Sequence, residues 1–403
     1  MVRNGRGEPL FAGAAPLFGY WHLHAGPGTP VAIAVAVAVV TFGPGLAARL
    51  AWPRLLAAGY ATAVVWTAAL AMVDGWQRGL AGRLTGGDEY LHEVPGVAGI
   101  WAMLRGFEGR ILDFQPGSWT THVAGHPPGA LLAFVGLDRI GLGGGGPAAV
   151  VCVLVGASVA VSVPVALRAL GAVGQARAAV PFLALFPGAV WVGVSADGLF
   201  AGVVGWGVAL LALGRRSNVA ALAGGVLLGY GLYLSYGLAL MALPALAVLL
   251  PSLRLLPALL AIAGVGLVVV AFTAAGFWWL DGYHLVVQRY YQGIGAERPY
   301  GYWAWANLAR LVLAVGPAAA AGLAAVSRPG GAPRAVRALV FATWLAVLLA
   351  DASGLSKAET ERIWLPFAVW LVAAAAALPR PRPWLAANAA VALAVNHLVF
   401  TGW

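Results

Sequence analysis

The sequence is poor in charged residues and in cysteine. Only 9% of its 403 residues are charged, against roughly 25% in an ordinary soluble domain. Its single cysteine, Cys152, lies in an apolar run, which excludes an internal disulfide and a cysteine metal cluster. The chain also has only fourteen acidic residues. It therefore lacks the polar surface that a soluble protein of this length requires.

What the chain has instead is apolar surface and positive charge. Hydrophobic residues make up 61% of it, and the formal net charge is +10. The arginines lie in short loops between apolar stretches and form no continuous stripe, so we expect membrane lipids and not nucleic acid as their partners. The abundance of arginine, alanine, valine and glycine is typical of a GC-rich bacterial genome, such as that of an actinobacterium.

Long apolar segments predict an all-α polytopic membrane protein with about twelve transmembrane helices, since each crossing needs about 20 apolar residues. The expected spans are roughly 30–48, 55–74, 147–167, 178–195, 198–214, 218–235, 237–252, 256–277, 304–326, 336–350, 364–378 and 384–401.

This pattern of apolar segments divides the chain into two parts. Residues 1–29 form an N-terminal segment, and residues 30–403 form a single transmembrane domain. Its outer loops, at about 75–146, 278–303 and 351–363, are expected to form the active site, because long loops are uncommon unless they are functional.

The charges divide unequally between the two sides of this arrangement. Six connecting segments hold twelve arginines and no acidic residue, whereas all fourteen acidic residues can be placed on the opposite side. Arginine accumulates in cytoplasmic loops, so the acidic side is predicted to face outward. The sequence therefore predicts a plasma-membrane protein whose chemistry lies at the extracytoplasmic surface.

The first outer loop is expected to contain interfacial helices. Residues 94–112 alternate apolar groups with Arg105, Glu108 and Arg110, as a helix at a membrane surface does. Residues 128–142 are apolar but carry charge near their end, which predicts a helix lying at the outer surface.

Paired carboxylates open this loop. Asp88 and Glu89 follow two glycines that permit a sharp turn after the second span. A carboxylate at the mouth of a bundle can take a proton from a hydroxyl nucleophile. A solvated loop acid or a helix N-cap explains the same spacing, so both interpretations stay open.

Three histidines in the loop, His92, His122 and His126, are candidates for hydrogen bonding to a phosphate or a sugar. No residue is assigned as a metal ligand, because the spacing is unspecific. A divalent cation on Asp88, Glu89 and His126 remains open.

The later outer segments carry further candidates for substrate binding. A carboxylate near the membrane usually has a partner, and Arg or Lys at a membrane mouth suits a phosphate. A helix cap, an aromatic belt and snorkelling side chains are the alternatives. The candidates are Asp197, Arg298, Lys357, Glu359, Glu361 and Arg362.

Taken in order, these motifs resemble the GT-C superfamily of integral-membrane glycosyltransferases. The likeness is greatest to the branch of protein O-mannosyltransferases and lipid A aminoarabinose transferases, and it covers roughly residues 55–380. The matching positions are Asp88-Glu89 at the start of the loop, His126-Pro127-Pro128-Gly129, Asp197, and Glu361-Arg362 ahead of Leu365-Pro366.

The resemblance implies an inverting transfer of a sugar from a polyprenyl-phosphate donor, such as one carrying mannose or arabinose, to an acceptor hydroxyl on a glycan, lipid or protein. Asp88 would be the general base, with Glu89 and His126 shaping the site. Arg362 and Lys357 would hold the donor phosphate, and Arg298 is a further candidate for that role.

Two other classes remain as alternatives. A transporter or lipid flippase would place paired charges near the middle of the membrane, whereas these spans are nearly free of charge. Another polyprenyl-lipid enzyme, such as a glycan ligase or polymerase, would depend on arginines and a histidine in a late outer loop.

Overall fold

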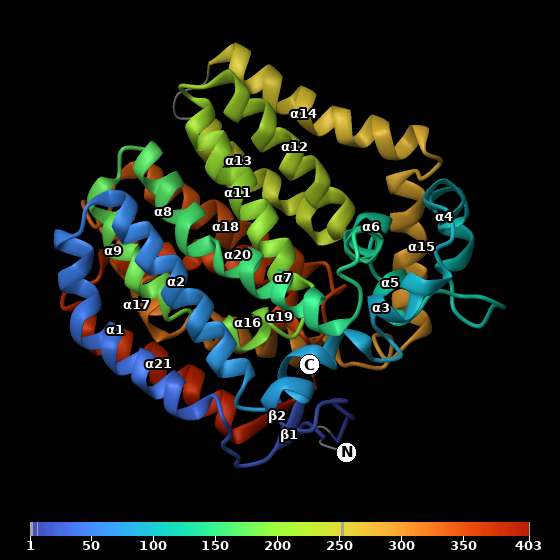
Figure 1. Cartoon of the computed structure of the whole chain (residues 1–403), viewed down its shortest axis with the longest axis horizontal. Coiled ribbons are helices and arrows are strands. Elements are labelled where there is room, and N and C mark those ends of the chain that lie inside the picture. Colours follow the sequence, from blue (N-terminus) through green and yellow to red (C-terminus); the bar gives the residue numbers. More distant parts are fainter. Residues whose placement is uncertain (1–2, 6, 251–253, 403) are drawn as a thin grey trace.

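The computed structural model describes residues 3–5, 7–250 and 254–402, and its framework is a bundle of helices (Figure 1). The first elements are β1 (Gly19–Trp21), α1 (Thr29–Arg49) and α2 (Trp52–Ala71). The first outer loop contains η1 (Gln77–Ala81), η2 (Arg83–Thr85), α3 (Tyr90–Glu93), η3 (Val94–Gly96), α4 (Ile100–Gly106), η4 (Glu108–Arg110), α5 (Thr121–Ala124) and α6 (Pro128–Arg139).

The middle of the chain contains α7 (Gly145–Ala157), α8 (Val159–Ala169), α9 (Val173–Ala184), α10 (Ala189–Val192), α11 (Asp197–Gly214), α12 (Asn218–Leu234), η5 (Tyr236–Met241), α13 (Ala242–Leu249) and α14 (Leu255–Ala274). The last part contains α15 (Trp279–Gln292), α16 (Tyr300–Val315), α17 (Pro317–Ser327), α18 (Arg334–Ala352), α19 (Thr360–Ile363), α20 (Leu365–Leu371), η7 (Val372–Ala377), α21 (Pro381–Leu398) and β2 (Val399–Thr401).

Six helices in the described part of the chain are long and apolar enough to cross a membrane: α1, α2, the continuous α7–α8, α11, α14 and α18. The pair α16 and α17, bent by 99°, makes a seventh if it is one span. The other predicted spans are helical, but their helices are shorter or broken. The fold is that of a helical membrane protein with several spans, and the predicted number of twelve is not confirmed. The end of the expected span 237–252 lies outside the described residues.

Helix α11 forms the centre of the bundle and is the most enclosed of the long helices, with 78% of its residues buried. Glycine allows its close contacts: a Cβ at Gly202 would lie 2.2 Å from the carbonyl oxygen of Val155. By contrast, α14 packs on α12 and buries only 17% of its residues, so most of its apolar surface is left for lipid.

The N-terminal segment packs against the transmembrane helices. Strand β1 pairs antiparallel with β2, with Gly19 opposite Thr401. Leu10 and Ala12 are buried against Trp303 and Ala306 of α16. The described residues of the N-terminal segment therefore pack on the surface of the bundle beside α16.

The first outer loop differs from the sequence prediction in where its helices end. Residues 94–112 form three short helices, η3, α4 and η4, in place of one amphipathic helix. Glycine is unfavourable inside a helix, and Gly99 and Gly106 stand at the two ends of α4. The helix expected at 128–142 is present as α6, which begins at Pro128 because proline suits the first helical turn.

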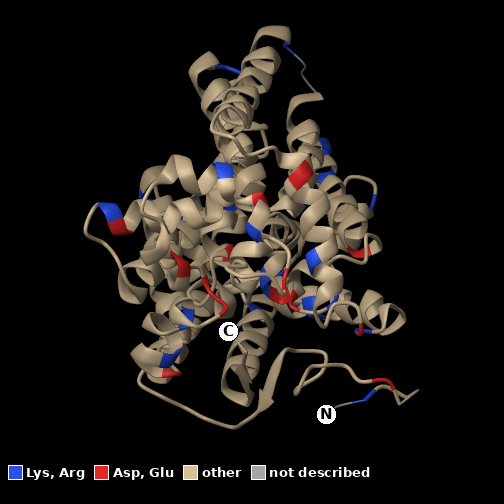
Figure 2. Ribbon diagram, turned by 90° about the vertical axis from the view of Figure 1, so that its right-hand side faces the viewer, with Lys and Arg blue, Asp and Glu red and all other residues tan. Residues whose placement is uncertain are grey.

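The loop helices α3 to α6 and the long helix α15 lie together at the right of Figure 1. Figure 2 looks onto that side and shows acidic and basic residues close to one another there. Among the described residues, seven acidic side chains form ion pairs with Arg or His: Asp74, Glu89, Glu93, Asp113, Asp197, Glu359 and Glu361.

The twelve arginines assigned to the opposite side behave differently. Within the described residues none of them forms an ion pair, and several bond to backbone carbonyls. Arg177 donates to the carbonyl oxygens of Ala47 and Leu50, and Arg254 donates to that of Arg215. Arg177 and Arg254 thus connect the turns between helices through backbone carbonyls, without an acidic partner.

Candidate active site

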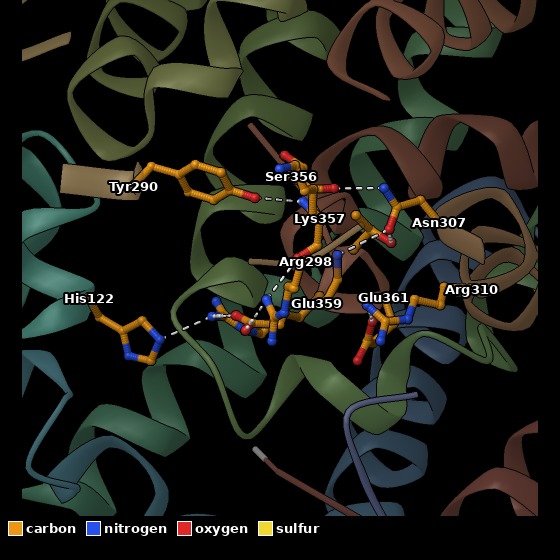
Figure 3. A network of polar contacts seen from close by, with 12 residues as sticks. His122, Tyr290, Arg298, Asn307, Arg310, Ser356, Lys357, Glu359 and Glu361 are labelled. Atoms are coloured by element: carbon orange, nitrogen blue, oxygen red, sulfur yellow. Dashed lines mark hydrogen bonds and ion pairs between the residues drawn. The ribbon is translucent and has the colours of Figure 1, made fainter. Parts of the chain in front are cut away.

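Three segments far apart in the sequence meet beside the end of α11. The first outer loop contributes α3 and α5, the second contributes α15 and the residues before α16, and the third contributes residues 356–362 with α19. Figure 3 shows their polar side chains, with His122 at one end and Asn307 at the other. All three outer loops expected from the sequence to form the site contribute to this network.

Four side chains form a line across the loops. Glu89 Oε1 lies 2.9 Å from Nδ1 of His122, and His122 Nε2 lies 3.0 Å from Nη2 of Arg362. Arg362 Nη1 donates to Asp197 at 2.7 Å, and its Nη2 also donates to Glu359 at 3.0 Å. Asp197, at the first turn of α11, is therefore tied through Arg362 to the first outer loop.

The two ring nitrogens of His122 face groups of opposite charge. A guanidinium can only donate hydrogen bonds, so His122 Nε2 is the acceptor from Arg362. Its Nδ1 lies beside the carboxylate of Glu89. His122 therefore joins a carboxylate to a guanidinium and is not itself a free base.

The third outer segment is held from several sides. Arg298 Nη1 donates to the carbonyl oxygen of Lys357 at 2.8 Å and lies 3.3 Å from Glu359. The ammonium of Lys357 donates to the carbonyl oxygen of Gly295 at 2.8 Å, and its backbone N–H donates to the hydroxyl of Tyr290 at 3.0 Å. Lys357 thus points into the protein, with its charge engaged by backbone.

The charges of the network shift the pKa values of its members. Burial alone would raise the pKa of Glu359, but Arg362 and Arg298 outweigh burial and hold it below its usual value. Burial opposes the charge of Arg362, yet Asp197 and Glu359 raise its pKa above the ordinary arginine value. Burial, followed by Arg298, lowers the pKa of Lys357. Glu359 and Arg362 are therefore fully charged at neutral pH.

The backbone of this segment is strained. Ala358 and Glu359 have φ values of 77° and 65°, in the left-handed region that side chains with a Cβ avoid. Such a residue costs roughly 1–3 kcal/mol and persists only where its surroundings fix it. One of the two strained residues is Glu359, whose carboxylate bridges Arg298 and Arg362. Backbone strain of this kind is typical of functional sites.

A second ion pair lies deeper. Arg310 of α16 is fully buried and stands 3.4 Å from the carboxylate of Glu361, which is 1% exposed. Arg310 also donates to the carbonyl oxygen of Pro16 and lies against the ring of Trp303. Glu361, a candidate from the sequence, therefore faces the N-terminal segment and not the first outer loop.

The remaining sequence candidates lie around the network. Asp88 is exposed, and its carboxylate accepts from the hydroxyl of Thr121 at 2.9 Å. His126 contacts the carbonyl oxygen of His122 through Nδ1, and burial lowers its pKa to about 4, so its ring is neutral. His92 is not part of the network and lines a separate cavity of about 370 Å³ together with Asp138.

Sequence reasoning missed three residues of this site. Asn307, Tyr290 and Arg310 all contact the third outer segment or its neighbours. A signal existed for Arg310, because a charge inside an apolar span is expensive and needs a partner. Asn307 and Tyr290 carry no such signal, since asparagine in a span or tyrosine at an interface is unremarkable by itself.

The residues present do not fit a metal site built from protein ligands. Within the described residues no three side chains of His, Cys, Asp or Glu are grouped closely enough to hold an ion. Glu89 is engaged with His122, and His126 turns Nδ1 toward a carbonyl oxygen. The chemistry of the site is therefore derived below from its carboxylates and guanidinium groups.

Comparisons with known proteins assign no family to this chain. No protein family matches the sequence, and no curated protein is similar to it. The chain is similar in structure to ArnT from Cupriavidus metallidurans, in the crystal structure of its apo state, with a TM-score of 0.37. The two are 15% identical, over 83% of this chain and 78% of that chain. A likeness this low concerns the general course of the helices and leaves the function to be argued from the site.

Proposed function

We propose that this protein is a membrane glycosyltransferase that passes a sugar from a polyprenyl-phosphate donor to an acceptor hydroxyl on the extracytoplasmic side. One observation carries the proposal. The exposed carboxylate of Asp88 stands on the same loop as Glu89 and His122, which reach a buried cluster of arginines beside apolar helices. A base at the surface next to buried positive charge suits a phosphate leaving group whose lipid tail stays in the membrane.

In the proposed reaction, Asp88 takes the proton of the acceptor hydroxyl. The acceptor oxygen forms a bond to the anomeric carbon as the bond from that carbon to the phosphate oxygen breaks. The bonding electrons leave with the phosphate, and one displacement inverts the anomeric centre. Thr121 donates to Asp88 and orients its carboxylate, while Glu89 and His122 join this loop to Arg362.

Arg298 is the best candidate to hold the donor phosphate. Its side chain is almost fully buried, and neither Nε nor Nη2 has a hydrogen-bond partner among the described residues. Buried N–H groups normally find acceptors, so two unmatched donors on a guanidinium favour an anionic ligand. Lys357 and Arg362 were expected to share this role; the Lys357 ammonium donates to the carbonyl oxygen of Gly295, and Arg362 donates to two acidic side chains. In this proposal they support Arg298.

A transporter or lipid flippase is the second candidate. The fully buried pair of Arg310 and Glu361 favours it, because ion pairs inside membrane helices often mark transport pathways. The exposed Asp88 has no evident part in such a pathway.

One experiment separates the glycosyltransferase from the transporter or flippase. Purified protein is given a polyprenyl-phosphate sugar, and transfer of the sugar to an acceptor is followed. Flipping of the lipid without transfer would favour the second candidate.

The proposed orientation predicts a labelling pattern. Cysteine at Gln115, an exposed residue of the first outer loop, should react with an impermeant thiol reagent in intact cells. Cysteine at Ser217, an exposed residue between α11 and α12, should react only after the membrane is opened. The native Cys152 is fully buried and gives a low background. The reverse pattern would move the site to the cytoplasm and contradict the proposal.

A further inference from the structure

Asn307 lies on α16 with its side chain buried against the third outer segment (Figure 3). Its Nδ2 donates to the carboxylate of Asp351 at 2.9 Å and to the carbonyl oxygen of Ser356 at 2.6 Å. Its Oδ1 accepts from the N–H of Ala358 at 3.3 Å and from the hydroxyl of Thr360 at 3.4 Å. One side chain thus bonds to three residues of a five-residue segment.

We propose that Asn307 is a positioning residue that holds residues 356–360 in the strained conformation that presents Glu359 to Arg298 and Arg362. This inference rests on the proposed function, since the position of Glu359 matters only if these arginines hold a substrate. Asn307 itself touches no reacting group in this account. It acts through the backbone of the segment.

The chemistry of the amide explains why asparagine is required. An amide has two N–H donors and a carbonyl oxygen with two lone pairs, and all four are used here. An aspartate side chain cannot donate to Ser356 or to Asp351. A leucine side chain can neither donate nor accept a hydrogen bond. Glutamine carries an extra methylene that the buried site must accommodate. Each donor and acceptor of the Asn307 amide has its own partner, and three of the four partners lie in one segment. A buried asparagine with a purely structural role does not need this arrangement.

The two left-handed residues connect this contact to the site. Ala358, the first of them, donates its N–H to Oδ1 of Asn307, and Glu359 is the second. Without Asn307 the N–H of Ala358 and the carbonyl of Ser356 lose their partners inside the protein. The segment is then free to relax toward the common region of backbone angles, which turns Glu359 away from Arg298.

Asn388 on α21 offers a matched control. It is also a fully buried asparagine, and its Oδ1 accepts from the backbone N–H of Ala318 beside the bend between α16 and α17. Among the described residues it makes no hydrogen bond to the third outer segment, so its loss should affect stability without moving Glu359. Asn307→Ala and Asn388→Ala therefore remove the same chemistry from two different places.

The first measurement does not depend on activity. Hydrogen exchange is followed by mass spectrometry on purified protein in detergent. In Asn307→Ala, peptides covering residues 354–362 should exchange roughly tenfold faster, since a lost hydrogen bond of ordinary strength has an effect of this size. In Asn388→Ala these peptides should exchange as in the native protein. Unchanged exchange in Asn307→Ala would overturn the proposal.

The second measurement tests the consequence for the reaction. With a polyprenyl-phosphate sugar and an acceptor, Asn307→Ala should raise the KM for the donor about tenfold and leave the acceptor KM within twofold. If native protein transfers no sugar, the proposed function fails, while the exchange data still decide the role of Asn307. A fall in kcat with both KM values unchanged would contradict positioning of a donor site.

A variant in which the side chains of positions 307 and 351 are swapped distinguishes loss of this contact from general misfolding. Asn307→Asp loses both donors and faces the carboxylate of Asp351, so it should behave like Asn307→Ala. Adding Asp351→Asn reverses that pair, because the new amide donates to the new carboxylate. The double variant should recover part of the slow exchange and part of the loss in donor KM, because the contact between positions 307 and 351 returns while the carbonyl of Ser356 still lacks its donor. A double variant as impaired as Asn307→Asp would show that the contact does not act as proposed.

A further variant is used if neither single variant folds. Tyr290→Phe removes the hydroxyl that accepts from the N–H of Lys357 on the opposite side of the segment. It should also speed hydrogen exchange in peptides covering residues 354–362.

Discussion

Replacing Arg362 by methionine should destabilise the protein by about 3–5 kcal/mol, because it leaves buried carboxylates without their partner. Arg362 is 5% exposed and bonds to Asp197, Glu359 and His122. The thioether of methionine fills much of the space but returns no hydrogen bond. The loss can be measured as the change in the midpoint of unfolding by heat or SDS in detergent micelles.

Arg78→Met is the control for this variant. Arg78 is half-exposed and lies 3.7 Å from Asp74, so its loss should change stability by about 1 kcal/mol or less. A second variant tests the mechanism: Asp197→Asn added to Arg362→Met should recover part of the stability, since one uncompensated charge is gone. If Arg362→Met unfolded like Arg78→Met, the network would not hold the outer loops together.

Asp88→Asn should lower the rate of transfer roughly 100- to 10,000-fold, the usual effect of removing a positioned base. Its stability should change little, because Asp88 is exposed and the amide can still accept from Thr121. Activity in proteoliposomes and the unfolding midpoint together separate loss of a base from loss of the fold. The donor KM should stay near its native value.

Two variants set limits on this assignment. Thr121→Val removes the hydroxyl that donates to Asp88 and should reduce the rate by about tenfold, because the base is kept but less well oriented. Glu89→Gln should lower stability as well as rate, since Glu89 is engaged with His122. Near-normal turnover in Asp88→Asn would rule out Asp88 as the base.

The sequence predicted the helical membrane class and named several members of the polar network, because both features follow from simple rules. Apolar runs need lipid, and carboxylates near a membrane need partners. Glu89, His122, Asp197, Glu359 and Arg362 were all named from position and residue type. Their meeting in one network depends on how the loops pack, and one sequence carries little information on that.

The predictions that failed did so for local physical reasons. The helix expected over 94–112 is broken where Gly99 and Gly106 occur, although the charge alternation suggested continuity. Several expected spans, such as those at α12 and α13, are apolar helices of fewer than 18 residues, so the predicted number of twelve spans is not confirmed. Asn307 escaped notice because its four partners come from α18 and from a segment about fifty residues later in the chain.

The proposed roles of Arg298 and Lys357 also changed once their partners were known. A basic residue at a membrane mouth suggests phosphate binding, but the suggestion holds only for donors that are not already used. Lys357 donates to a backbone carbonyl, whereas two nitrogen atoms of Arg298, Nε and Nη2, have no acceptor among the described residues. Sequence identifies the charge, and the structure is needed to see whether that charge is available.

The choice of donor tests the central claim most directly. Purified protein in proteoliposomes would receive an acceptor fraction and a radiolabelled sugar on either a polyprenyl phosphate or the matching nucleotide, with mannose and arabinose tried first. We expect label in the acceptor only from the polyprenyl-phosphate sugar, and none with Asp88→Asn. Transfer from the nucleotide sugar alone would contradict the account, as would equal transfer by the native protein and Asp88→Asn.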